Sequence, residues 1–132
     1  MKRLGVVILL ASLLALVSCS RKTSSTGGET AGLHPQLLVT SLPAGVEGVE
    51  LARTGLHVIK GYQFVKDSDS TFAIARMSDG QHVTSGGCGC AVTGGCEPEM
   101  TDGGIIICKA NDCTDCGLRL TVAGANTMIF KY

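Results

Sequence analysis

The chain has 132 residues, which is room for one domain of ordinary size. Hydrophobic residues make up 45% of it, but aromatic residues make up only 4% and tryptophan is absent, so we expect a modest core. The formal net charge is zero. This balance excludes the strongly basic surface of a typical nucleic-acid-binding protein, and no nucleic-acid partner is expected.

The N-terminus carries a short apolar run behind two basic residues. Lys2 and Arg3 precede a run of 15 residues from Leu4 to Ser18. A membrane-spanning helix needs about 18 to 20 apolar residues, whereas a basic start followed by a shorter run is typical of a signal peptide. We therefore expect residues 1–18 to be a signal peptide that is absent from the mature protein.

The end of this run resembles the lipobox of bacterial lipoproteins, with Leu16, Val17 and Ser18 followed by Cys19. The resemblance implies cleavage before Cys19 and lipid attachment to its sulfur, and several acyl chains at about 0.8 kcal/mol per buried methylene give firm anchoring. Ser20 resembles the residue that directs enterobacterial lipoproteins to the outer membrane. The expected location is the bacterial cell envelope, in the outer membrane or at the cell surface. The alternative is an ordinary secretory signal with Cys19 as a free or structural thiol.

The remaining chain divides into a linker and a domain. Residues 20–32 contain no large apolar side chain, so with the lipidated cysteine we expect a flexible linker over 19–32. A random coil of this length spans about 20 Å. Residues 33–132 are expected to form a small domain, and its segment 86–117 is rich in cysteine.

The domain shows the pattern of short strands. Polar or glycine-rich turns separate apolar stretches at spacings of about ten residues, which is typical of an antiparallel β sandwich, barrel or meander. Strands are expected at residues 56–59, 62–66, 71–77, 105–108, 118–122 and 126–132. Turns are expected at 67–70 and at the doubled glycines 86–87, 94–95 and 103–104. The sequence therefore predicts an all-β domain.

Six of the seven cysteines are expected to form three disulfides, because an exported protein matures in an oxidising compartment. They are Cys88, Cys90, Cys96, Cys108, Cys113 and Cys116. Small domains with few aromatic residues gain about 2–4 kcal/mol from each such bond. A hairpin of residues 88–92 and 104–108, centred near Pro98, would place Cys88 opposite Cys108, and this is one of several possible pairings.

A metal site is the first alternative use of these cysteines. Cys113 and Cys116, followed by Gly117, resemble the knuckle of zinc ribbons, so Cys88 and Cys90 with Cys113 and Cys116 would form a zinc or iron site. Cys88 and Cys90 depart from that family, because they are two residues apart rather than three and do not form a second knuckle.

A thiol–disulfide redox partner using Cys113 and Cys116 is the second alternative. Reactive thiolates usually lie at a helix N-terminus or beside a cation. Here a strand pattern follows the pair, and Asp112 and Asp115 supply the opposite charge, so this function is disfavoured.

Catalytic motifs of the common hydrolases, metalloproteases and nucleotide-binding enzymes do not occur in the sequence. His34, His57 and His82 are scattered along the chain. We expect no catalytic residue, no enzymatic activity and no cofactor. The expected role is structural or binding, with the membrane as one partner through Cys19 and an envelope protein or surface ligand as another.

Overall fold

The computed structural model describes residues 35–132. The expected signal peptide, the lipidated Cys19 and the linker over 19–32 lie outside these residues. The described part is all-β, as predicted, and contains no helical segment long and apolar enough to cross a bilayer. Its strands are β1 (Gln36–Leu37), β2 (Val49–Leu51), β3 (Leu56–Val58), β4 (Tyr62–Lys66), β5 (Thr71–Arg76), β6 (His82–Cys90), β7 (Gly95–Met100), β8 (Ile105–Asn111), β9 (Cys116–Val122) and β10 (Ala125–Lys131).

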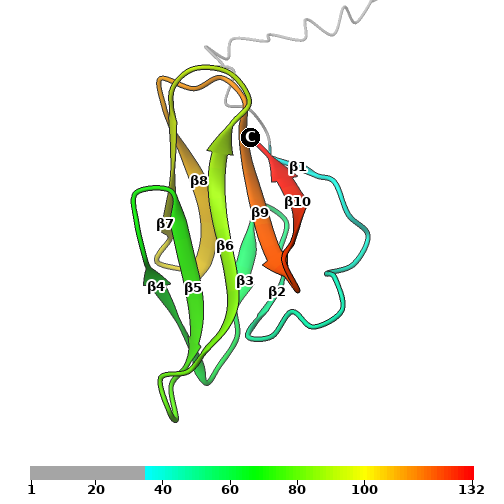
Figure 1. The fold of residues 1–132 in the computed structure, drawn as a ribbon, viewed down its shortest axis with the longest axis vertical. Helices are drawn as coiled ribbons and strands as arrows, with labels where there is room; N and C mark the ends of the chain where they lie inside the picture. The colour runs from blue at the N-terminus through cyan, green and yellow to red at the C-terminus, as the bar shows by residue number, and fades with distance from the viewer. Residues whose placement is uncertain (1–34) are drawn as a thin grey trace, which may run out of the picture. The chain divides into compact units, whose positions relative to one another are not determined.

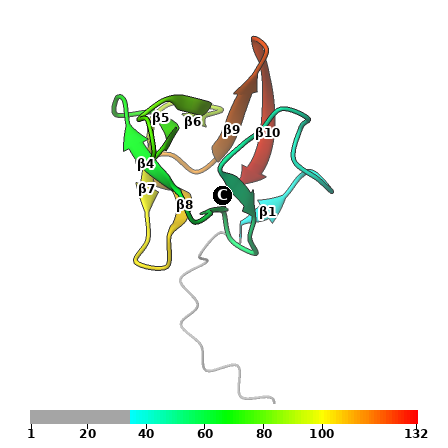
Figure 2. The same ribbon diagram turned by 90° about the horizontal axis from the view of Figure 1, so that it is seen from below.

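The strands form two antiparallel sheets. The larger sheet has the order β1-β10-β9-β6-β5-β4 and the smaller has the order β2-β3-β8-β7. Figure 1 shows β3 and β8 of the smaller sheet behind β6 and β9 of the larger one, and Figure 2 shows the same layers from below. Of the three predicted architectures, the domain therefore adopts the sandwich.

The core lies between the two sheets and follows the alternation of side chains along each strand. Thr84, Cys88, Ile106 and Cys108 are buried in this way. The largest fully buried side chains are Leu56, Phe72, Ile74, Ile106, Leu118, Leu120, Ile129 and Phe130. β5 is buried on both faces from Phe72 to Ala75, with Phe72 and Ile74 on one face and Ala73 and Ala75 on the other.

A polar cluster around Arg76 joins an irregular loop to the larger sheet, at the end of β5 remote from the cysteines. Arg76 Nε and Tyr62 Oη both donate hydrogen bonds to Glu47 Oε1, at 3.2 and 2.6 Å. Both bonds lower the pKa of Glu47, and the bond from Tyr62 has the largest effect. Thr84 Oγ1 donates to the Glu47 carbonyl at 2.7 Å. The cluster thus fixes the segment that leads into β2.

The predicted turn at Gly86 and Gly87 is wrong, since both residues lie inside β6. A Cβ added to Gly86 would lie 2.5 Å from Cζ of Phe72 and 2.7 Å from the Arg119 carbonyl oxygen. Gly86 is therefore needed for close packing of a strand against an aromatic ring. Gly94 and the pair 103–104 do lie at turns, where Gly94 and Gly104 have φ values of 118° and 72°, and Gly95 begins β7.

We expect Gly86→Ala to lower the free energy of unfolding by about 1–3 kcal/mol, because the methyl group overpacks the core. Gly89→Ala in the same strand is the matched control. Its Cβ would meet only the end of the Arg119 side chain, at 3.3 Å, and this side chain can move, so a change within about 0.5 kcal/mol is expected. Urea unfolding of both variants measures the difference, and equal losses would contradict the packing explanation.

Candidate functional site

The six cysteines of the described region form three disulfides. Cys88 is bonded to Cys108, Cys90 to Cys113, and Cys96 to Cys116. The Cα–Cα distances of 5.6, 6.1 and 5.9 Å lie in the usual range for disulfides. The expectation of a disulfide-stapled domain is therefore confirmed.

The structure contains the Cys88–Cys108 pair, but the hairpin from which the sequence predicted it is wrong. β6, which carries Cys88, pairs with β5 and β9, whereas β8, which carries Cys108, pairs with β3 and β7. The two cysteines thus belong to different sheets and meet across the core. Pro98 is not in a turn but in β7, opposite Cys108. β7 is an edge strand, where a residue without a backbone N–H is tolerated.

All three disulfides lie at one end of the sandwich. Cys96 in β7 and Cys116 in β9 form a second bond between the sheets. Cys90, at the end of β6, is bonded to Cys113 in the connection between β8 and β9. This end is therefore covalently closed, while hydrogen bonds and packing hold the opposite end.

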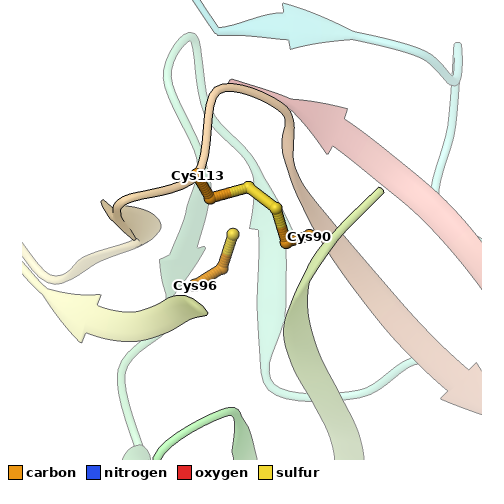
Figure 3. A group of neighbouring side chains, drawn as sticks. All are labelled: Cys90, Cys96 and Cys113. Carbon is orange, nitrogen blue, oxygen red and sulfur yellow. A yellow bond between two sulfur atoms is a disulfide. The ribbon is translucent and has the colours of Figure 1, made fainter. Parts of the chain in front are cut away.

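The structure brings together a different group of sulfurs from the predicted metal set. The Sγ atoms of Cys90, Cys96 and Cys113 all lie within 4.8 Å of one another. Figure 3 shows the Cys96 sulfur pointing toward the bond between the other two. Of the four cysteines in the predicted set, Cys90 and Cys113 belong to this group and Cys88 and Cys116 do not, whereas Cys96, which was not predicted, does. Each of these sulfurs belongs to a disulfide, and zinc binding requires thiolates, so the oxidised group does not offer a zinc site.

The Cys-X-X-Cys pair is not bonded to itself, because Cys113 and Cys116 have different partners. The backbone N–H of Asp115 donates a hydrogen bond to Cys113 Sγ at 3.4 Å. The Asp115 carboxylate pairs with Lys131 Nζ at 2.9 Å, which offsets part of the negative charge beside the motif. The hypothesis of a redox pair formed by Cys113 and Cys116 therefore does not match the pairing in the structure.

A hollow of about 620 Å³ lies beside the sulfur cluster, and its lining includes Cys90, Cys96 and the acidic residues Asp69 and Glu97. Glu97 accepts hydrogen bonds from Lys66 and, at 3.3 Å, from Asn111. Both bonds lower the pKa of Glu97, and the bond from Lys66 has the largest effect. The sequence did not indicate this hollow, because residues from the β4–β5 turn, β6, β7 and β8 form it only after folding.

The histidines of the described region do not form a common site. His57 lies in β3 of the smaller sheet, and its Nδ1 is 2.8 Å from Oε1 of Glu50 in an exposed pair. His82 is exposed in β6 of the larger sheet. His34 lies outside the described residues.

The disulfide end and the hollow beside it are thus the candidate functional site within residues 35–132. The site contains disulfide sulfurs next to the carboxylates of Asp69 and Glu97, and the Glu97 carboxylate is ion-paired with Lys66. Comparison of the chain with models of known protein families, with curated proteins and with solved structures finds no match.

Proposed function

We propose that this chain is a lipid-anchored protein of the bacterial cell envelope with a structural or binding role and no catalytic activity. The observation that carries the proposal is the set of three disulfides, two of which join the sheets. Such bonds form and persist in oxidising compartments outside the cytoplasm. The resemblance of residues 16–19 to a lipobox supports both the export and the anchor.

The proposed role is to hold a durable binding domain at the outer membrane or cell surface. Each disulfide closes a sequence separation of 20 to 23 residues, which corresponds to about 3 kcal/mol of stabilisation. The predicted linker over 19–32 would separate the domain from the lipid headgroups. Its partner in this proposal is another envelope protein or a surface ligand.

We expect Cys19→Ala to abolish acylation. Cells that express the full chain are grown with an alkyne-tagged fatty acid, and the protein is then tested for label, mass and sedimentation with membranes. The unchanged chain should carry the label and lack residues 1–18, whereas the variant should be unlabelled and retain them. Ser18→Ala, which keeps a small residue before the cysteine, is the matched control and should be labelled. An unlabelled parent chain, or normal maturation of Cys19→Ala, would contradict the lipid anchor.

The intact mass of the purified protein under non-reducing conditions separates this function from the metal-binding alternative. Three disulfides remove six hydrogens from the six thiols. That mass, with no free thiol and no bound metal, is the result expected. Zinc or iron that is retained, and whose removal by a chelator unfolds the domain, would favour an envelope metal-binding protein instead.

A further inference from the structure

The three disulfides differ in their access to solvent. Five of the six cysteines are buried, with exposed fractions of 1 to 6%. Cys90 alone among the six is half-buried; it lines the 620 Å³ hollow together with the buried Cys88 and Cys96, so its greater exposure is what distinguishes it. We propose that the Cys90–Cys113 disulfide is a thiol-exchange site, at which a small external thiol forms a mixed disulfide with Cys90 and releases Cys113. This activity goes beyond the structural role and does not depend on the lipid anchor.

The surroundings of the two sulfurs set the direction of the exchange. The Asp115 N–H donates to Cys113 Sγ at 3.4 Å and stabilises negative charge there. Of the two acidic neighbours that oppose a thiolate, Asp115 has its carboxylate paired with Lys131 at 2.9 Å, so that the Asp112 carboxylate is the opposing charge that remains. The Thr93 carbonyl oxygen lies 3.5 Å from Cys90 Sγ and disfavours negative charge on that sulfur. The sulfur that carries charge better leaves faster, so Cys113 is the leaving group and Cys90 is the sulfur attacked.

The exchange balances without an oxidant or reductant. The external thiolate supplies the electron pair of a new bond to Cys90 Sγ, and the electron pair of the Cys90–Cys113 bond departs on Cys113 as a thiolate. One thiol is consumed and one is formed. The protein gains the mixed disulfide as a covalent modification inside the hollow.

The released Cys113 thiolate has a second disulfide beside it. Cys96 Sγ lies within 4.8 Å of Cys113 Sγ and is bonded to Cys116. Figure 3 shows that it points toward the Cys90–Cys113 bond. Attack on Cys96 would form a Cys96–Cys113 bond and release Cys116 as the thiolate, so the new free thiol is shared between Cys113 and Cys116. The proposed handover thus uses the close packing of the Cys90, Cys96 and Cys113 sulfurs.

The charge of the hollow selects the thiol. Asp69 and Glu97 both line it, and Glu97 is paired with Lys66, whereas Asp69 has no ion-pair partner among residues 35–132. A negatively charged thiol is repelled by the remaining carboxylate, so we infer that the ligand is a small thiol that is neutral or positively charged.

The test uses the full chain, oxidised and purified in detergent. It is treated with a limited amount of 2-mercaptoethanol, quenched with N-ethylmaleimide and mapped by peptide mass spectrometry. We expect the mercaptoethanol adduct on Cys90 and maleimide on Cys113 and Cys116. The Cys88–Cys108 bond should react at no more than about one tenth of the rate of the Cys90–Cys113 bond. An adduct on Cys113 in place of Cys90, or equal reaction of Cys88 and Cys108, would overturn the proposal.

Two variants make the test independent of any general loosening of the fold. Cys90→Ser with Cys113→Ser should remove the fast reaction and leave the other two bonds intact. Asp69→Asn keeps all cysteines, and it should reduce the preference for cysteamine over mercaptoacetate by a few-fold. An unchanged preference in Asp69→Asn would show that the hollow does not admit the thiol. If the double variant does not fold, the mapping on the parent chain still decides the proposal.

Discussion

Reduction of all three disulfides is expected to unfold the sandwich at room temperature. The bonds span sequence separations of 20, 23 and 20 residues, and a loop of this length corresponds to about 3 kcal/mol per bond. A domain of this size has a total stability of only about 5–15 kcal/mol. The chain has five aromatic residues and no tryptophan, so core packing alone contributes too little stability to replace that of the disulfides.

Urea unfolding followed by far-ultraviolet circular dichroism, with and without a phosphine reductant, measures this effect. We expect a cooperative transition for the oxidised protein and no folded baseline for the reduced one. The matched control is the double variant Cys88→Ser with Cys108→Ser, which removes a single bond. It should remain folded and lose about 3 kcal/mol. A reduced protein that keeps the urea midpoint of the oxidised one would contradict the importance of these cross-links.

The strands that sequence patterns located best are those with local apolar signals. The predicted strand at 62–66 coincides with β4, and that at 71–77 differs from β5 by one residue. The prediction at 118–122 covers most of β9. In each case alternating or continuous apolar residues lie next to polar turns, so local chemistry is sufficient to define the element.

The strands that carry most of the site could not be located in this way. β6 contains three glycines and β7 contains Pro98, and neither shows a continuous apolar pattern. Both are held by partners distant in sequence: β6 by β5 and β9, and β7 by β8 and a disulfide. Their strand conformation is a consequence of tertiary contacts rather than of local propensity.

The prediction of the disulfide pairing was limited in the same way, because the sequence pattern contains no information about contacts between distant strands. Alternation of side chains along extended strands predicts that Cys88, Cys90, Cys108 and Cys116 face the core; Cys88, Cys108 and Cys116 are buried, whereas Cys90 is half-buried. Alternation does not say which sheet a strand joins, so the Cys88–Cys108 bond was inferred from a hairpin that does not exist. The position of Cys96 beside Cys90 depends on the packing of two sheets, and no spacing in the sequence encodes it.

Phe72→Ala is expected to lower the free energy of unfolding of the oxidised protein by about 3–5 kcal/mol. Phe72 is fully buried in β5, packs over the inner face of Gly86 and lies with its ring centroid 5.6 Å from that of Phe64. Removing its ring leaves a cavity in the core beside Gly86 of β6. The three disulfides restrict the unfolded chain and do not fill that space, so they cannot compensate for the loss.

Phe64→Ala is the matched control, since Phe64 is half-buried in the edge strand β4. It should lose only about 1–2 kcal/mol, because much of its ring area is already in contact with solvent. Urea unfolding of both variants, with the disulfides intact, gives the two values. A clear excess for Phe72 means that core packing and cross-links both stabilise the sandwich. Similar small losses for the two would mean instead that the disulfide end alone holds the sheets together.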